Sequence, residues 1–372
     1  MILSNPFIVD PRVHNEAKTL VDNGHKVTVI VWDRHNIYKD EEIIDGIRII
    51  RVHNIKIMKN LKSDLIRNPI WWRIAYKKAV FLYRNGLKFD VVHCHDLDTL
   101  PAGVLLKKRF GIRLVYDAHE IFGNMIARTM PKIIVKIAFY LEKLLVKHVD
   151  NIITVNEPLL NYFRSISSKE ITIVMNLKEL IIDRYSPTNN EIFTLLYIGV
   201  LHRSRMFPEL VDIIGEIDNV KLIVAGKKEN IFDEVKQRSK RYSNVEFIGS
   251  ISYDKVLKFT LSADVVLCMI NPEDLNNRIA LANKQFEAMV CGRPIICTKG
   301  TLSGKITEKE KCGLVVEYKK NALKEAIIKL RDNPKICEEL GKNALKAAID
   351  KYNWELEEKK LIMLYNKIDE KK

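Results

Sequence analysis

The sequence predicts an α/β protein built from two doubly wound parallel sheets. The chain has 372 residues, of which 47% are hydrophobic, so it is long enough to bury two separate cores. In each half, apolar strand-like segments alternate with helical segments, a pattern typical of βαβ units. The loop-like stretch 183–190 separates the halves and is the predicted linker. We therefore expect one domain at residues 1–187 and a second at residues 188–351.

Charge and composition narrow the range of partners. The formal net charge of +14 favours an anionic partner, such as a phosphorylated substrate, nucleic acid or an acidic membrane surface. The sequence contains no motif of a nucleic-acid-reading module, so nucleic acid is not an expected partner. It contains neither an apolar run of about eighteen residues nor a leader pattern, and its cysteines are scattered. We expect a cytoplasmic protein with reduced thiols.

The first loop is expected to lead from a strand into a helix. Residues 1–4 would end a short strand, and an upstream start is left open. Asp10 has the residue type of a helix N-cap, and Pro11 suits the first helical position. The loop has no glycine, so Arg12 is the candidate for contact with an anion there; the alternative is a surface residue at a helix end. Further strands are expected at 27–32 and 47–52.

A basic and aromatic segment, Lys56–Lys88, follows in the first half. It has the composition of an amphipathic helix that could lie on an anionic membrane. The alternative is that its apolar face covers the sheet and its basic face is solvated. The stretch 128–147 has a similar character. The cations of the two stretches are Lys56, Lys59, Lys62, Arg67, Arg73, Lys77, Lys78, Arg84 and Lys88, and Arg128, Lys132, Lys136, Lys143 and Lys147.

Polar side chains follow two of the predicted strands in the first half. Ligands of a doubly wound sheet bind beyond the carboxyl ends of its strands, so these side chains are candidates for a site. Zinc is not expected, because no H-x-x-x-H pair with a nearby third ligand occurs. The residues are His93, His95, Asp96, His119 and Glu120.

The second half contains a predicted anion site. In the segment 279–300, a helix is expected to begin at Asn283 and Lys284 and to stop at Gly292 before a buried strand. A helix N-terminus favours phosphate, and Lys284 adds a full charge. Glu287 lies on the same helix face as Lys284, where it could hold a ribose. The alternative is a solvated pair on a surface helix.

Two further positions lie at predicted strand ends in this half. A turn carrying Arg203 and Arg205 follows the strand-end Gly199, and phosphate binding is expected of these arginines. As isolated residues they would be ordinary surface charges. Gly249 ends another predicted strand.

The segment NKQFEAMVCGRPII resembles the signature of the group 1 (family 4) retaining glycosyltransferases, which have the GT-B fold. DAHE at 117–120, LHRSR at 201–205, CGLVV at 312–316 and YNWE at 352–355 are similar to other elements of that family. The resemblance implies two Rossmann-like domains. It also implies a C-terminal helix at 352–372 that packs on the first domain.

The resemblance also implies roles for individual residues. In the family's E-x7-E pattern the second Glu, here Glu287, binds the ribose, and the first is replaced by Ile279. His119 matches the histidine beside the transferred sugar. The residues implied for the donor diphosphate and its nucleoside are Gly199, Arg203, Arg205, Gly249, Asn283 and Lys284, of which Arg205 and Lys284 would be catalytic together with His119. On the acceptor side we expect Arg12, His95 and Glu120; Glu120 could instead orient the His119 imidazole, and His95 could only shape the wall of the site.

The function expected from this resemblance is retaining transfer of a hexose-type sugar from a nucleotide diphosphate sugar. The acceptor would be a sugar, such as a lipid-linked sugar or a polysaccharide. Basic side chains would offset the donor's charge in place of a divalent cation, so neither a metal nor any other cofactor is expected, and the domains would close about the linker. We also expect peripheral attachment to the inner face of the membrane through Lys56–Lys88.

Other functions remain open at this stage. A nucleotide-sugar epimerase on the same fold and a non-catalytic membrane scaffold are the alternatives. A dehydrogenase is disfavoured, because no G-x-G-x-x-G follows the first strand.

Overall fold

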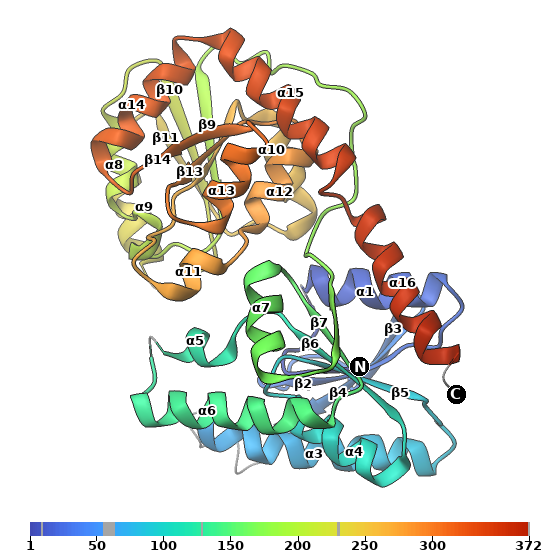
Figure 1. Cartoon of the computed structure of the whole chain (residues 1–372). Coiled ribbons are helices and arrows are strands. Elements are labelled where there is room, and N and C mark those ends of the chain that lie inside the picture. Colours follow the sequence, from blue (N-terminus) through green and yellow to red (C-terminus); the bar gives the residue numbers. More distant parts are fainter. Residues whose placement is uncertain (9, 55–63, 128, 229–230, 371–372) are drawn as a thin grey trace. The chain divides into compact units, whose positions relative to one another are not determined.

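The computed structural model describes residues 1–8, 10–54, 64–127, 129–228 and 231–370, with the side chains of 64–66 excluded. The chain divides into two compact units, Met1–Asn176 with Glu357–Lys372, and Leu177–Leu356 (Figure 1). The predicted division lay at residue 187. The structure begins the second unit earlier because the backbone after Asn176 is tied within that unit, where Trp354 N donates to Lys178 O (2.9 Å).

The first unit contains, among its described residues, an eight-stranded sheet in the order β3-β4-β2-β1-β5-β6-β7-β8. β3 pairs antiparallel with β4, and the other neighbours are parallel. The strands are β1 (Ile2–Leu3), β2 (Thr28–Asp33), β3 (Glu41–Ile44), β4 (Ile47–His53), β5 (Val91–His95), β6 (Arg113–Ala118), β7 (Asn151–Thr154) and β8 (Glu170–Ile173).

Helices cover both faces of this sheet (Figure 1). On one face, Gly103 of α4 lies so close to Cys94 that an added Cβ would be 2.4 Å from Sγ. Tyr116 of β6 donates to Glu142 of α6 on the same side (2.8 Å). The helices of the unit are α1 (Pro11–Asp22), α3 (Asp64–Arg84), α4 (Leu100–Phe110), α5 (Phe122–Ile126), α6 (Lys132–Leu145), α7 (Glu157–Ile166), α16 (Trp354–Glu370) and the 3₁₀ turn η1 (Val146–His148).

Helix α3 occupies part of the basic segment Lys56–Lys88, and its apolar face covers the sheet. Trp71 is fully buried and stacks on Trp32 of β2, with ring centroids 5.3 Å apart. Ala75 and Ala79 follow it on the same face, while Arg73 and Lys77 are exposed. The sheet-covering alternative is therefore confirmed for this helix. Lys56, Lys59, Lys62 and Arg128 lie outside the described residues.

The C-terminal helix α16 packs on the first unit, as predicted. Met175 N donates to the Glu357 carboxylate (2.8 Å), and Tyr365 pairs with His93 of β5 (Oη to Nδ1, 2.9 Å). Tyr365 is only 6% exposed. This helix therefore closes the sheet face that also carries α1.

The second unit contains, among its described residues, a six-stranded parallel sheet in the order β11-β10-β9-β12-β13-β14. Its core joins strand residues such as Leu195 and Leu267 to helix residues such as Leu210 and Leu323. The strands are β9 (Phe193–Ile198), β10 (Val220–Ala225), β11 (Val245–Gly249), β12 (Val265–Cys268), β13 (Ile295–Thr298) and β14 (Gly313–Val316). The helices are α8 (Glu209–Gly215), α9 (Phe232–Ser239), α10 (Val256–Ser262), α11 (Leu275–Ile279), α12 (Asn283–Val290), α13 (Leu302–Lys309), α14 (Lys320–Arg331) and α15 (Pro334–Asp350), with 3₁₀ turns η2 (Arg203–Arg205) and η3 (Tyr253–Lys255).

A cavity of about 420 Å³ lies in the first unit at the amino-terminal ends of the strands. Its lining includes Val27, Phe89 and Val91, which precede or begin their strands. Parallel sheets bind ligands at the opposite, carboxyl ends, so we place the candidate site there instead. None of the described helices is long and apolar enough to cross a bilayer.

Candidate active site

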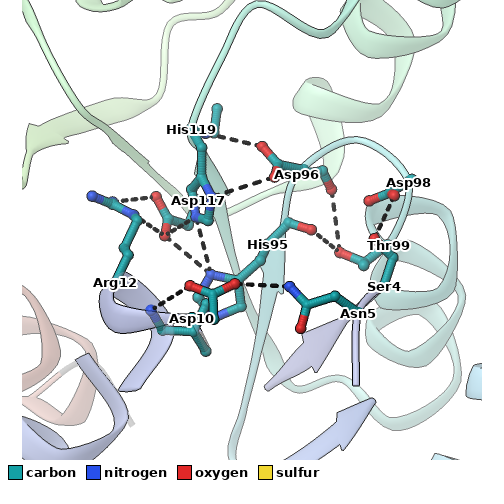
Figure 2. Close-up of polar contacts among 12 residues, drawn as sticks. Ser4, Asn5, Asp10, Arg12, His95, Asp96, Asp98, Thr99, Asp117 and His119 are labelled. Atoms are coloured by element: carbon teal, nitrogen blue, oxygen red, sulfur yellow. Dashed lines mark hydrogen bonds and ion pairs between the residues drawn. The ribbon is translucent and has the colours of Figure 1, made fainter. Parts of the chain in front are cut away.

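The first part of the candidate site lies where β5 and β6 end. β5 ends at His95, and Asp96 follows with a positive φ of 60°. β6 ends at Ala118, directly before His119. Because β5 and β6 are parallel neighbours, the histidines meet at one sheet edge, as Figure 2 shows. Both histidines therefore lie at strand ends, where the sequence placed them, and they lie close together.

His119 is held between two aspartates. Its Nε2 lies 3.0 Å from Asp117 Oδ2, and its Nδ1 lies 3.3 Å from Asp96 Oδ2. The backbone N–H of His119 also donates to Asp96 (3.0 Å). Burial by itself lowers the pKa of His119, but Asp96 and Asp117 outweigh it and raise the pKa to about 10. With 21% of its side chain exposed, His119 presents a cationic imidazolium at the site.

His95 lies behind His119. Its side chain is fully buried, and its Nδ1 is 3.1 Å from Asp117 Oδ2 and 3.3 Å from His119 Nε2. Burial and the neighbouring His93 lower the pKa of His95 well below its usual range, so this ring is neutral. Direct contact of His95 with an acceptor does not fit its burial; the ring contacts Asp117 and His119 instead. Glu120, directly after His119, is half-buried.

Arg12 occupies the interior, not the surface. It is 3% exposed, and its guanidinium contacts Asp117 (Nη2 to Oδ1, 2.7 Å), Glu16 (3.0 Å) and Val174 O (2.8 Å). Arg12 and His119 hold the pKa of Asp117 well below its usual range, against the effect of burial. The alternative of a surface residue at a helix end is therefore wrong. The geometry makes Arg12 a positioning residue for Asp117 and opposes direct contact with an acceptor.

Four buried side chains behind His119 have the chemistry of metal ligands. Glu16, His93, His95 and Asp117 each offer one atom, and these atoms lie within 4.8 Å of one another. The sequence argument against zinc used local spacing, which could not show this group, because the residues come from α1, β5 and β6. Arg12, however, lies against both carboxylates. It supplies the positive charge that a metal ion would otherwise bring, so the group does not favour a metal.

The glycine-free first loop is held by side chains. Asp10 caps α1, accepting from Val13 N (3.2 Å), as predicted. Asn5 donates to the same Asp10 carboxylate (2.8 Å), and Ser4 donates to Asp98 beyond β5 (2.5 Å), as shown in Figure 2. These bonds fix the loop beside the histidines.

The second part of the candidate site lies where β9 ends, beside the start of α12. Helix α12 begins at Asn283, as predicted. The Lys284 ammonium lies over the ring of Tyr197, 3.4 Å from its centroid. A Cβ on Gly199 would lie 3.2 Å from Lys284 Nζ, so any larger residue at position 199 would crowd this ammonium. Burial lowers the pKa of Lys284 to about 8, and the positive charge of Arg205 acts in the same direction.

The two predicted arginines differ in their surroundings. Arg205 donates to Asn277 Oδ1 (3.0 Å), and it is close enough to Lys284 to lower that residue's pKa. Arg203 is 63% exposed and pairs with Glu234 (3.0 Å). Arg205 and Lys284 thus form a cationic pair, whereas Arg203 has the surroundings of an ordinary surface charge.

Glu287 is buried, and its partner was not foreseen from the sequence. It is 7% exposed, and its Oε1 lies 3.5 Å from Lys178 Nζ. Lys178 also lies over the ring of Tyr253, 4.5 Å from the centroid. The alternative of a solvated Lys284–Glu287 pair is therefore wrong. Nothing in the local sequence around Lys178 signals this contact, because Lys178 and Glu287 are far apart in the chain.

Gly249 ends β11 with a positive φ of 74°, in the left-handed region that favours glycine. Its carbonyl accepts from Gly226 N at the end of β10 (2.9 Å). Ser250 Oγ donates to Gly226 O (3.0 Å). The segments after β10 and β11 are therefore hydrogen-bonded to each other through Gly226, Gly249 and Ser250. The end of β10 is also bonded to Gly199 after β9, since Gly199 N donates to Ala225 O (3.1 Å).

Family models match most of the chain. The model described as Glycosyltransferase Family 4 matches residues 10–176, and that described as Glycosyl transferases group 1 matches residues 192–333. The chain belongs to the group 1, family 4 glycosyltransferases. An uncharacterized glycosyltransferase of Methanocaldococcus jannaschii is 21% identical over 360 residues, covering 90% of this chain and 87% of the relative. A protein from the cps region of Klebsiella pneumoniae is 25% identical over 317 residues, covering 78% and 80%.

Solved structures show that this glycosyltransferase has the GT-B fold. Sucrose-phosphate synthase from Thermosynechococcus elongatus matches with a TM-score of 0.81 at 18% identity, covering 100% of this chain and 99% of that one. Anabaena HepE, solved in complex with UDP-glucose, matches with a TM-score of 0.72 at 12% identity, covering 98% of each chain. The predicted fold class and family are confirmed.

Proposed function

We propose that this glycosyltransferase transfers a hexose-type sugar from a nucleotide diphosphate sugar to a sugar acceptor, with retention and without a metal ion. The observation that carries the proposal is the cationic pair at the end of β9. Lys284 and Arg205 lie together there, and Glu287 is one turn further along α12 from Lys284. This arrangement suits a diphosphate next to a ribose.

The donor's charge would be offset by the second unit. A departing diphosphate develops negative charge, and preorganised cations at that point supply a large share of the catalysis. Lys284, with a pKa of about 8, is charged at neutral pH. The start of α12 adds the positive end of a helix dipole, which favours an anion. The solved complexes of Anabaena HepE with UDP and with UDP-glucose support a nucleotide-sugar donor here as well.

The ribose would be held by Glu287. A buried carboxylate accepts hydrogen bonds from a hydroxyl pair, and the Lys178 ammonium lies 3.5 Å from this one. Ile279 replaces the carboxylate that relatives place before α12, so the second unit supplies one fewer polar contact to the donor sugar.

His119 would act on the transferring sugar through its positive charge. A histidine with a pKa of about 10 is protonated at neutral pH, and its two ring nitrogens face Asp117 and Asp96, so it would offset negative charge near the sugar and would not act as a general base. Retention, the hexose class and a metal-independent reaction rest on the resemblance to the family. Lipid-linked sugars and polysaccharides are the acceptor classes that we propose to test first.

A panel of nucleotide diphosphate sugars tests the proposal. We expect one donor to raise the thermal unfolding midpoint and to release free nucleotide, in the presence of a chelator as well. Lys284→Ala and Glu287→Ala should abolish both effects. Lys299→Ala and Glu317→Ala, which alter an exposed ion pair of the same unit, should not.

Other outcomes would contradict the proposal. An isomerised nucleotide sugar without transfer would show an epimerase. A chain that binds no donor, or whose donor binding survives both site substitutions, would favour a scaffold. Loss of activity on chelation, restored by a divalent cation, would contradict metal independence.

A further inference from the structure

Helix α6 carries an apolar stripe on its outer surface. Ile133, Ile137, Tyr140 and Leu144 are 63%, 53%, 65% and 38% exposed. Their spacing of four, three and four residues places them on one face of a helix. Large apolar side chains gathered in this way mark an interaction surface.

The inner face of α6 fixes which side points outward. Glu142 is fully buried and accepts hydrogen bonds from Tyr116 (2.8 Å) and Tyr162 (2.6 Å). Phe139 makes an edge contact with Tyr162, with centroids 6.2 Å apart, and Ala138 is 7% exposed. Rotating the helix to hide the stripe would break these contacts. The stripe is therefore a fixed feature of the first unit.

Cations flank the stripe. The exposed lysines of α6 and the turn that follows it are Lys132, Lys136, Lys143 and Lys147. Glu142 is the acidic residue of α6, and it points inward. On the neighbouring α4, the exposed residues include Leu105, Lys108 and Arg109. Among the described side chains of α3, α4 and α6, no acidic residue is exposed.

From this geometry we propose that the outer face of α6 docks the enzyme on an anionic lipid surface. Aliphatic side chains bordered by lysines suit the boundary between acyl chains and acidic headgroups. A second copy of this chain is a poorer occupant, because pairing of the two stripes would bring the two lysine rows together. Nucleic acid is poorer still, because three of the four stripe residues are aliphatic and do not stack on bases.

The inference is independent of the donor chemistry. The sequence predicted a membrane contact through Lys56–Lys88. The apolar face of α3 packs on the sheet, so we assign the membrane contact to α6 instead. A membrane contact would bring the first unit to lipid-linked acceptors. Donor hydrolysis in solution should not depend on it.

Vesicle co-sedimentation of the full chain tests the inference. Vesicles of phosphatidylcholine with about 30% phosphatidylserine should pellet the protein at low salt, and pure phosphatidylcholine should not. Ile133→Gln with Ile137→Gln should lower the partition coefficient at least tenfold. The matched control is Ile37→Gln with Ile43→Gln, because these isoleucines are 68% and 71% exposed elsewhere in the same unit.

A variant with fewer lysines tests the electrostatic contribution to membrane binding. Replacing Lys132, Lys136 and Lys143 by Gln should weaken binding about fivefold per lysine and flatten its dependence on salt. The same change at Lys320, Lys329 and Lys335, which are exposed in the second unit, should have little effect. Unchanged thermal midpoints and donor hydrolysis would show that the variants are folded.

Three results would overturn the inference. They are failure of the native chain to pellet with anionic vesicles, equal binding by the α6 variants, and equal loss in the control variants. A dimer in sedimentation velocity that the Ile133 and Ile137 substitutions dissociate, without loss of vesicle binding, would assign the stripe to a second copy.

Discussion

Arg12 Nη2 lies 2.7 Å from Asp117 Oδ1, although the two residues are 105 positions apart in the chain. Arg12 belongs to the first turn of α1, and Asp117 to the end of β6. The same aspartate contacts His119. A buried ion pair in the sheet interior therefore positions the imidazolium that faces the candidate site.

Replacing Asp117 by Asn tests this arrangement. Loss of the carboxylate removes one of the two acidic partners of the buried Arg12 guanidinium and leaves only Glu16, so the free energy of unfolding should fall by about 3–5 kcal/mol. The pKa of His119 should fall as well, because Asp117 is one of the two charges that raise it. Urea unfolding and an NMR titration of the imidazole measure the two effects.

The matched control is Asp40→Asn, whose carboxylate is 89% exposed beside His53. It should change stability by less than about 0.5 kcal/mol. A normal His119 titration in the native protein, near its ordinary value, would refute the proposed role of Asp117.

The raised pKa of His119 predicts a pH dependence of stability. The group binds its proton more tightly in the folded chain, so its contribution is fully present below the unfolded pKa of about 6.5. That contribution is lost as the pH rises through about 10. Its size should be on the order of 5 kcal/mol, from the difference between the two pKa values.

Urea unfolding from pH 6 to pH 10.5 measures this dependence. The stability difference between the native chain and His119→Gln should shrink as the pH rises, since other titrating groups are common to both. A difference that stays constant over this range would contradict a protonated His119.

Lys284 predicts a pH dependence of donor binding. Its pKa of about 8 in the free protein should rise when a diphosphate binds, because the anion favours the charged ammonium. Affinity for the nucleotide sugar should be constant below about pH 7 and should fall by up to about tenfold per pH unit above 8. Calorimetry between pH 6.5 and 9.5 follows the change.

Lys284→Arg is the control for this titration. A guanidinium stays charged over the whole range, so the affinity of this variant should be flat above pH 8. Parallel curves for the native chain and the variant would show that another group controls binding.

Gly199→Ala should disturb donor binding through Lys284. The added Cβ would lie 3.2 Å from Lys284 Nζ, at a φ of +145° that L side chains rarely adopt. We expect about a tenfold loss of nucleotide-sugar affinity and a stability loss of about 1–3 kcal/mol.

Gly24→Ala is the control that separates backbone strain from a direct effect on the donor site. Gly24 has a φ of +87° with no atom within 4 Å of an added Cβ, so its substitution adds strain without touching the donor site. Comparable losses of affinity in both variants would show that Gly199 acts through global stability instead.

The sequence by itself determined the local features of this protein. The cap at Asp10, the helix start at Asn283 and the strand end at His95 follow from the chemistry of neighbouring residues, and the structure has them where the sequence predicted them. The strand predicted to end at Gly199 ends one residue earlier, at Ile198. Alternating strands and helices likewise predicted both sheets. These signals are readable because the interactions behind them join residues a few positions apart.

Only the tertiary structure decided which charges are buried together. Arg12 meets Asp117, and Glu287 meets Lys178, because separate elements pack side by side. The segments of α3 and α6 both mix basic and apolar residues, yet α3 stacks Trp71 on the sheet, whereas α6 exposes its apolar stripe. The cost of burying a charge or an apolar face depends on what lies opposite it, and residues that lie opposite one another are distant in the sequence.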